Sequence, residues 1–285
     1  MMTSRHPSEY HLADLQIIEP GRVEKNYWRD LWCYRELFQV LAWRDVAVRY
    51  KQTIIGVVWA ILRPVLTMLV FTVIFSRVAR LPSEGTAPYP LMVLAGMLPW
   101  TFISTALSDA SNSLIGSASL IGKVYFPRLI IPVATIVVAF VDLLISFAIL
   151  CIMMIWYRFL PTWHVLFLPF FVLLAFLASL GPGLWVTSLN VKYRDFRYVL
   201  PLALQLGLYI SPVGFSSSVI PLKWRPFYSL NPIVGVIDGF RWCILGGASH
   251  IYGTGLGISM FVIISFLLLG IKHFRQMEKT FADLI

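Results

Sequence analysis

Residues 129–156 read LIIPVATIVVAFVDLLISFAILCIMMIW, a run that is apolar on every side and carries one charged residue, Asp142. At about 1.5 Å per residue, a helix of this length reaches roughly 42 Å, more than the hydrocarbon thickness of about 30 Å. A helix that is apolar all round is buried in a large core or faces lipid. The stretch therefore predicts a transmembrane helix that tilts or projects beyond the bilayer.

Five other stretches approach the length of a membrane-spanning helix, about 20 apolar residues. They run over 54–76, 90–108, 163–189, 199–215 and 254–271. We expect Gly181-Pro182-Gly183 and Ser211-Pro212 to interrupt two of them, which is tolerated where neighbouring groups satisfy the freed backbone. The pattern predicts an all-α integral membrane protein with six transmembrane helices, and one transmembrane domain over 53–272.

The composition of the chain excludes a soluble protein. Of its 285 residues, 58% are hydrophobic and 13% are charged, whereas soluble domains are about 45–50% apolar and about 25% charged. The net charge of +9 comes from 23 Lys and Arg against 14 Asp and Glu. Cytoplasmic loops of membrane proteins are enriched in Lys and Arg, which accounts for this excess without a nucleic-acid partner.

The distribution of Lys and Arg predicts the topology. With both termini in the cytoplasm, sixteen of these residues fall in the cytoplasmic tails and loops and six in the outer segments. Residues 1–52 lack the apolar core of a signal peptide, so we expect the first span to remain in the mature chain. We predict polar cytoplasmic tails over 1–28 and 273–285.

Residues 29–52 have the pattern of an amphipathic interfacial helix before the first span. Its apolar face comprises Leu31, Tyr34, Leu37, Phe38 and Leu41. Polar residues Arg35, Glu36 and Gln39 fall on the opposite side. Such a helix is either a simple anchor for the first span or a gate that also docks a partner.

Residues 216–250 form neither a clean span nor a polar loop. Apolar and aromatic residues are interleaved with Pro221, Pro226 and Pro232, and a short helix is expected before Gly246-Gly247. Two short re-entrant helices that enter the membrane from its outer face fit these lengths. A folded outer loop is the alternative.

The sequence contains no motif of a catalytic or metal site. Segment 116–123 resembles a phosphate-binding loop, but five residues separate its glycines instead of four, and Val124 replaces the Ser or Thr that binds Mg²⁺. Cys33, Cys151 and Cys243 are widely spaced, and the histidines are scattered. We therefore expect no catalytic residue, no metal site and no cofactor on this chain.

Charged and aromatic residues inside the spans indicate where a polar substrate could pass. Asp142 and Arg63 lie within spans, where charge is costly. The alternatives are a helix–helix hydrogen bond for Asp142 and snorkelling to the head groups for Arg63. Aromatic rings stack on the C–H faces of sugars, and the candidates for lining a sugar pathway are Trp59, Trp100, Phe102, Tyr209 and Phe215. Each can equally belong to an interfacial belt or to the packed core.

Six short strings occur in the order and spacing of a known transporter family. They are RYKQTIIG at 49–56, KVYFPR at 123–128, NVKYRDFRY at 190–198, YISP at 209–212, YSLNPIVGVIDGFR at 228–241 and EKTFADLI at 278–285. From about residue 29 onward, the chain resembles the permease subunit of ABC-2 type polysaccharide exporters, which handle O-antigen, capsule and teichoic-acid chains. The last two strings are most similar to the O-antigen branch.

The resemblance implies a channel-forming permease in the bacterial cytoplasmic (inner) membrane, surrounded by membrane lipids. Two copies of the chain would pair with two copies of a separate ABC ATPase subunit, which carries the ATP and Mg²⁺. The substrate would be a polyprenyl-diphosphate-linked glycan. The residues that match the family's ATPase-coupling elements are Arg35, Phe126, Pro127 and Arg128, with Asp195 and Arg197 as weaker candidates.

A lipid diphosphate is anionic, and the cations just before the first span can capture it at the membrane surface. These residues are Arg44, Arg49 and Lys51. The alternative is an ordinary positive-inside flank without a specific ligand.

Three rival functions stand beside this one. The same superfamily also exports drugs and lipids. An intramembrane glycosyl- or acyltransferase would need Asp109, Asp142 and His164 to converge in the fold, although they are dispersed along the chain. A proton-coupled flippase would depend on Asp142.

Overall fold

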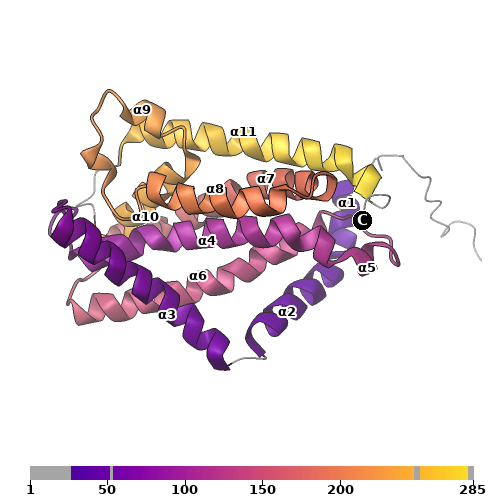
Figure 1. Ribbon diagram of the computed structural model, residues 1–285, viewed down its shortest axis with the longest axis horizontal. Coiled ribbons are helices and arrows are strands. Elements are labelled where there is room, and N and C mark those ends of the chain that lie inside the picture. The colour runs from indigo at the N-terminus through magenta and orange to yellow at the C-terminus, as the bar shows by residue number, and fades with distance from the viewer. Residues whose placement is uncertain (1–26, 52–53, 247–250, 282–285) are drawn as a thin grey trace, which may run out of the picture.

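The computed structural model describes residues 27–51, 54–246 and 251–281, and within 51–60 it describes the side chain of Val58 alone. Its described part is helical throughout, with no β-strand (Figure 1). Five helical segments there are long and apolar enough to cross a membrane. They are α3 (Ile54–Phe71) with the π-helical η2 (Thr72–Val78), α4 (Tyr89–Gly116), α6 (Ile130–Trp156), η3 (Trp163–Phe167) with α7 (Leu168–Lys192), and α11 (Gly253–Met277) with η5 (Glu278–Thr280).

The sixth expected span is represented by a shorter helix, α8 (Phe196–Ile210), so the count of six is not confirmed. At about 1.5 Å per residue α8 covers roughly 22 Å, less than the hydrocarbon core. It ends directly before Ser211-Pro212, because proline lacks the N–H that would continue the hydrogen-bond ladder. The interruption expected at Ser211-Pro212 is therefore present.

The interruption expected at Gly181-Pro182-Gly183 is wrong, because α7 runs through it without a break. Gly181 instead lets another helix approach closely, as does Gly270 on that helix. A methyl group added at Gly181 would lie 2.6 Å from the backbone nitrogen of Leu267 in α11, and one at Gly270 would lie 2.1 Å from the carbonyl oxygen of Gly181. The segment thus serves close packing of α7 against α11 and not a bend.

Helix α4 is the centre of the bundle, in contact with α6, α7 and the shorter helix α10 (Pro232–Ile244). Nearly all of its first four turns is buried, including Leu91, Met92 and Val93, which are fully inaccessible. Helix α10 begins where the side-chain oxygen of Asn231 accepts a hydrogen bond from the N–H of Ile233, an N-cap that the following proline reinforces.

The region 216–250, where two re-entrant helices were predicted, contains η4 (Ser217–Val219), α9 (Arg225–Tyr228) and α10 in its described part. Only α10 is longer than a single turn, and it packs against α4, α7 and α11. The helices η4 and α9 lie at the end of the bundle where α11 begins (Figure 1). The re-entrant arrangement is not confirmed.

Helices α1 (Tyr27–Cys33) and α2 (Arg35–Lys51) occupy the predicted interfacial segment, and α2 slopes away from the bundle axis (Figure 1). The face predicted to be apolar packs against the protein and not only against a membrane, since Leu41 is buried against α6 and its neighbours. The opposite side exposes Trp28, Trp32 and Trp43, at 59%, 72% and 74% of their surfaces. Tryptophan favours the membrane–water interface, so this side fits the head-group region.

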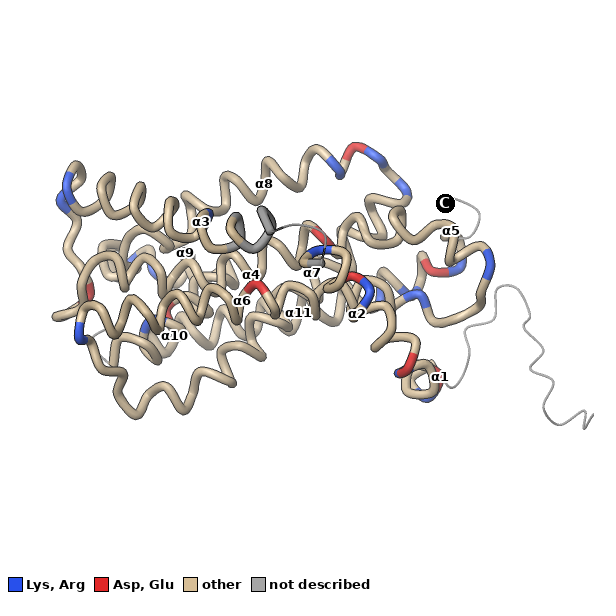
Figure 2. The backbone as a smooth tube through the Cα atoms, turned by 90° about the horizontal axis from the view of Figure 1, so that it is seen from below, with Lys and Arg blue, Asp and Glu red and all other residues tan. Residues whose placement is uncertain are grey.

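The two ends of the bundle are chemically distinct from its middle. Figure 2 shows charged residues gathered mainly toward the ends, with few between them. One end carries α1, α5 (Ala118–Ile121) and η5, and we call it the α5 end. The other carries α9, the connection before α4 and the connection after α6, and we call it the α9 end.

Candidate functional site

Two cavities in the described part of the chain are lined by charged and hydroxyl side chains. One, of about 310 Å³, lies at the α9 end, and the other, of about 370 Å³, lies beside α2. The second, which we call the central cavity, is bounded by α2, α3, α4, α6 and one residue of α8. Its lining residues are Arg49, Tyr50, Arg63, Pro64, Thr67, Met97, Trp100, Thr101, Ser104, Thr105, Asp142, Ser146 and Leu208.

Arg49 is the charged centre of this cavity. Its Nη1 lies 2.8 Å from Oδ2 of Asp109 in α4, and its Nη2 lies 2.9 Å from Oδ2 of Asp142 in α6. Tyr50, the next residue of α2, donates a hydrogen bond from its hydroxyl to the other oxygen of Asp142. One guanidinium thereby joins three helices, α2, α4 and α6.

Two carboxylates outnumber the guanidinium in this cluster, and both ion pairs remain partly open to solvent. About a third of the Arg49 and Asp109 side chains, and 23% of the Asp142 side chain, remain exposed, so the pairs are only partly desolvated. Partly solvated ion pairs are individually weak, about 0–1 kcal/mol. Arg63 lines the same cavity and is exposed. A ligand anion can therefore compete with the carboxylates for Arg49.

Asp142 thus makes the interhelical contact that was one of its two predicted roles, and Arg49 also joins it to Asp109, which the transferase alternative had named with it. The third residue of that alternative, His164, stacks on Trp163 in η3 instead. Asp109 and Asp142 lie on different helices, and Arg49 is 60 positions from Asp109. No local sequence pattern announces such a pair. The available signal was the cost of burying charge at Asp142, which requires a partner.

The predicted aromatic residues separate into different environments. Trp100 lines the central cavity, and its ring packs against Gly207 of α8. Phe102 is 1% exposed and lies in the core with its ring centroid 4.8 Å from that of Phe140. Tyr209 is 60% exposed on α8, and Phe215 packs near Phe75. The structure does not place these four on one continuous wall.

The other predicted residues beside the first span have different surroundings. Arg44 is exposed and pairs with its own neighbour Asp45, at 2.7 Å between Nη2 and Oδ1. The side chains of Lys51 and Trp59 lie outside the described residues. Of the three cations predicted to bind the lipid diphosphate, Arg49 alone is shown to line a cavity.

At the α5 end, the KVYFPR segment is divided into an anchored half and an exposed half. Phe126 and Pro127 are buried, and the backbone N–H of Arg128 donates to Oε1 of Glu278 at 2.8 Å. Exposed residues precede them, including Lys123 and Val124, and a groove of about 220 Å³ runs along the segment. Any partner that docks here touches the exposed half first.

The remaining predicted coupling residues lie on the surface. Arg35 is exposed, with its guanidinium carbon 6.0 Å from the ring centroid of Trp32. Asp195 and Arg197 are exposed at the start of α8. Within the described part of the chain, none of the three forms an ion pair. Because their side chains are exposed, a partner can reach them.

Arg241 in α10 has no exposed surface, although sequence analysis distinguished it only by its charge. Its guanidinium donates to the carbonyls of Met92 at 3.3 Å, Val213 at 2.8 Å and Phe215 at 2.8 Å, and to Oε1 of Glu84 at 3.2 Å. These bonds fasten α10 to α4 and to the chain that follows α8. The arginine is therefore a structural tie at the α9 end.

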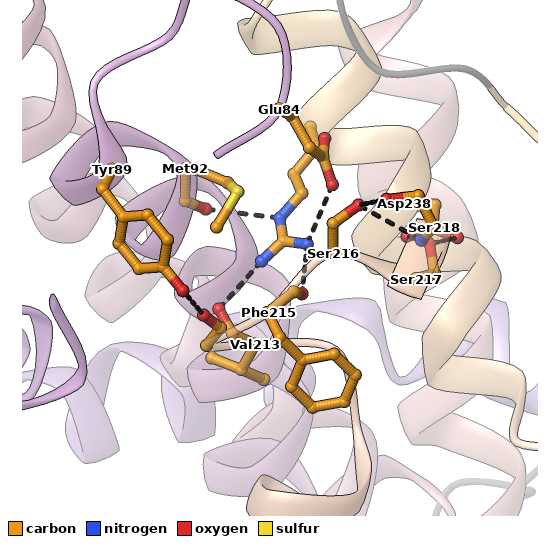
Figure 3. Close-up of polar contacts among 11 residues, drawn as sticks. Glu84, Tyr89, Met92, Val213, Phe215, Ser216, Ser217, Ser218 and Asp238 are labelled. Atoms are coloured by element: carbon orange, nitrogen blue, oxygen red, sulfur yellow. Dashed lines mark hydrogen bonds and ion pairs between the residues drawn. The ribbon is translucent and has the colours of Figure 1, made fainter. Parts of the chain in front are cut away.

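Beside this tie, Asp238 accepts a hydrogen bond from Ser217, whose hydroxyl oxygen lies 2.7 Å from each carboxylate oxygen (Figure 3). Burial raises the pKa of Asp238 to about 6, while the Ser217 hydroxyl and the charge of Arg241 act in the opposite direction.

Comparison with known proteins identifies the family. The ABC-2 type transporter family matches residues 36–245, from α2 to the end of α10. The chain belongs to the ABC-2 type transporter family. It is an integral membrane protein in which the matched region holds the central cavity, the KVYFPR segment and the Arg241 tie.

Several named relatives align with most of this ABC-2 transporter. It is 25% identical over 252 residues to the O-antigen export system permease protein RfbA of Klebsiella pneumoniae, covering 88% of this chain and 95% of that protein. It is 27% identical to the RfbA protein of Myxococcus xanthus, covering 75% and 82%. The polysialic acid transport protein KpsM of Escherichia coli is 26% identical, covering 85% and 93%.

Proposed function

We propose that the chain is the channel-forming permease subunit of an ATP-driven exporter that moves polyprenyl-diphosphate-linked polysaccharide, in particular O-antigen, across the bacterial inner membrane. The observation that carries this proposal is the alignment over nearly the full length of O-antigen permeases. ATP hydrolysis belongs to a partner, and the functional unit contains two copies of each chain. The α5 end faces the cytoplasm, with both termini on that side.

In this proposal Arg49 receives the diphosphate. A diphosphate esterified at both ends carries about two negative charges, as many as Asp109 and Asp142 together, and it can compete for the guanidinium because those pairs are partly solvated. The exposed tryptophans of α1 and α2 hold this part of the chain at head-group depth, where the diphosphate of a lipid-linked glycan lies.

The glycan then follows the diphosphate past Trp100, which offers an aromatic face without a full charge. Such a wall allows sugar rings to slide without tight binding. Tyr209 and Phe215 extend this route only if the exposed side of α8 also faces it, as in a channel formed between two copies of the chain. Phe102 does not line this route, because it is buried in the core beside Phe140.

Coupling to the ATPase runs through the exposed part of KVYFPR and through Arg35, with Asp195 and Arg197 as a second contact. Phe126 and Pro127 transmit the movement, because they are buried against the helices that bound the groove. The bond from Arg128 to Glu278 ties this loop to the end of α11. A displacement of this loop therefore moves both α6, which follows it, and α11.

The test is co-purification of the tagged chain with an ABC ATPase encoded in the same genome, in mild detergent. We expect a complex with two copies of each chain that hydrolyses ATP. A chain that purifies alone in several detergents, while the ATPase is abundant, would contradict the proposal. In that event a proton-coupled flippase becomes the better account, and loss of activity in Asp142→Asn would favour it.

A further inference from the structure

The cavity of about 310 Å³ at the α9 end is separate from the central cavity, since the two share no lining residue. Its walls come from the connection before α4, from 216–218, from α9 and α10, and from the residue before α11. The groups that carry the argument are Glu84, Ser217, Arg225, Tyr228, Asp238 and Tyr252.

Glu84 supplies an unpartnered acceptor in this wall. The residue is 8% exposed, and its Oε1 accepts a hydrogen bond from Arg241 at 3.2 Å. Its Oε2 is buried and has no hydrogen-bond partner. A buried carboxylate oxygen without a donor costs free energy, so a donor that reaches it from the cavity would stabilise the complex.

Asp238 has spare acceptor capacity as well. Both of its oxygens lie 2.7 Å from the hydroxyl oxygen of Ser217. A hydroxyl has one proton and donates one hydrogen bond, so Ser217 satisfies only one of these oxygens at a time. The other can accept from a ligand. Two carboxylates of the cavity lining therefore keep unused acceptor capacity.

The cavity has two carboxylates, Glu84 and Asp238, and two arginines, Arg225 and Arg241, at or beside its wall. This balance of charge indicates which class of ligand the cavity would bind. Arg241 forms an ion pair with Glu84. Arg225 donates hydrogen bonds from Nε to the carbonyl of Ile220 at 2.9 Å and from Nη2 to the carbonyl of Ser218 at 2.8 Å. A balanced wall favours a neutral ligand over an anion such as phosphate. Among the described residues, no group of three or more His, Cys, Asp or Glu could hold a metal ion, which argues against a divalent cation.

Hydroxyl donors and a flat apolar ring face are the two features that a sugar presents. The hydroxyl of Tyr228 is already used in a hydrogen bond to the carbonyl of Ile210 at 2.7 Å, so its contribution to the cavity is mainly its ring. Tyr252 lines the same cavity. Carboxylates that accept from hydroxyls, beside aromatic rings that contact C–H faces, form a carbohydrate-binding combination.

We propose that this cavity is a saccharide subsite, in which Glu84 and Asp238 accept hydrogen bonds from the hydroxyls of a neutral sugar residue of the exported chain. The inference rests on the proposed function for its substrate and its sidedness, because the α9 end is then the outer end. Weak binding at this point would hold the emerging glycan outward between power strokes and oppose backsliding.

The experiment measures protection of a cysteine placed in the cavity. Ser218 lines the cavity and is exposed, so Ser218→Cys is introduced into a Cys33→Ser/Cys151→Ser chain, in which the remaining Cys243 is fully buried. The probe is a membrane-impermeant maleimide, applied to the purified full-length chain with and without delipidated oligosaccharides from the host's own surface polysaccharide. Lys223→Cys, exposed outside the cavity lining, is the matched control.

If a sugar site of about 1 mM affinity is present, oligosaccharide at about 10 mM slows labelling of Ser218→Cys roughly tenfold and leaves Lys223→Cys unchanged. Asp238→Asn, which keeps the shape and leaves Arg241 untouched, should remove most of this protection while the amount of folded chain stays the same. Glu84→Gln provides the second variant and should weaken protection in the same direction.

Equal labelling with and without oligosaccharide would overturn the subsite, as would protection by Ca²⁺ alone or a Ser218→Cys that no maleimide reaches. These results are independent of whether the chain exports polysaccharide. Unprotected cysteine in a strain whose surface polymer depends on this chain refutes the subsite and leaves the proposed function standing. Protection in a chain that is dispensable for surface polymer refutes the proposed function instead.

Discussion

Arg49 is the residue of the central cavity that makes two ion pairs, because its guanidinium bridges Asp109 and Asp142 on two different helices. A bidentate cation held by partly solvated partners is suited to releasing them when a stronger anion arrives. The same geometry would serve a purely structural clamp. The two roles differ in what happens when the charge is removed but the size is kept.

We predict that Arg49→Gln lowers export of surface polymer by at least about tenfold while the chain still accumulates in the membrane, because ion pairs of this exposure contribute only about 0–1 kcal/mol to stability. Export is measured as polymer on the cell surface, normalised to the amount of chain in membranes. Arg158→Gln, an exposed arginine at the α9 end, is the control. Export by Arg49→Gln equal to that of the control would show that Arg49 has no part in substrate binding.

The buried Arg241 should behave in the opposite way. Arg241→Lys leaves carbonyls of three residues short of donors, since an ammonium cannot reproduce the planar fork of a guanidinium. We predict a loss of about 3 kcal/mol or more, seen as a lower melting temperature in detergent and less chain in the membrane. Arg77→Lys, which is exposed, should change neither quantity. A normal melting temperature for Arg241→Lys would refute the structural tie.

At the scale of elements, the close approach of α7 and α11 depends on Gly181 and Gly270. We predict that Gly270→Ala separates these helices and destabilises the bundle by about 1–3 kcal/mol, because the added methyl would meet the carbonyl oxygen of Gly181 at 2.1 Å. Gly257→Ala in the same helix meets nothing within 4 Å and should be neutral or slightly stabilising. The measurement is the melting temperature of each variant, and equal values would contradict the close contact between α7 and α11.

The connection between α5 and α6 makes a different prediction, because its exposed half is free to change without disturbing the core. Val124→Asp places a charge on the 50%-exposed residue beside the groove. We expect the variant to fold normally but to recover at least about tenfold less ATPase on purification, since an unpaired charge at an apolar contact is costly to desolvate. Tyr157→Asp at the α9 end is the control. Undiminished recovery by Val124→Asp would place the docking surface elsewhere.

The elements show where reasoning from sequence succeeds. Apolar length is a property of a continuous segment, so five spans could be predicted before the fold was known. Proline effects depend on surroundings, and the same residue type ends α8 at Pro212 but leaves α7 intact at Pro182. Gly181 beside Pro182 is where α11 packs closely against α7, and that helix is more than 70 residues away in the sequence.

The site shows where such reasoning stops. Trp100 and Phe102 are alike as aromatic residues inside a span, but a helix turns about 200° over two residues, so they face opposite sides and only Trp100 reaches the cavity. The pairing of Tyr50 with Asp142 joins residues 92 positions apart. Composition can announce that a charge within a span needs a partner, but only the folded arrangement of three helices selects that partner.

On the scale of the whole molecule, the polar features lie in series along the bundle. The KVYFPR groove is at the α5 end, the central cavity is bounded by α2, α3, α4 and α6, and the Glu84–Asp238 cavity is at the α9 end. Such an order suits vectorial transport, in which energy enters at one end and substrate leaves at the other. The account therefore requires that the polymer be made inside the cell and reach the surface only through this chain.

The most direct measurement is the location of the polymer in a strain that lacks this chain, compared with the same strain carrying it on a plasmid. The account predicts that the deletion strain still makes full-length, lipid-linked polysaccharide but retains it on the cytoplasmic side, and that the plasmid restores it to the surface. Surface polymer of normal amount and length in the deletion strain would contradict the account.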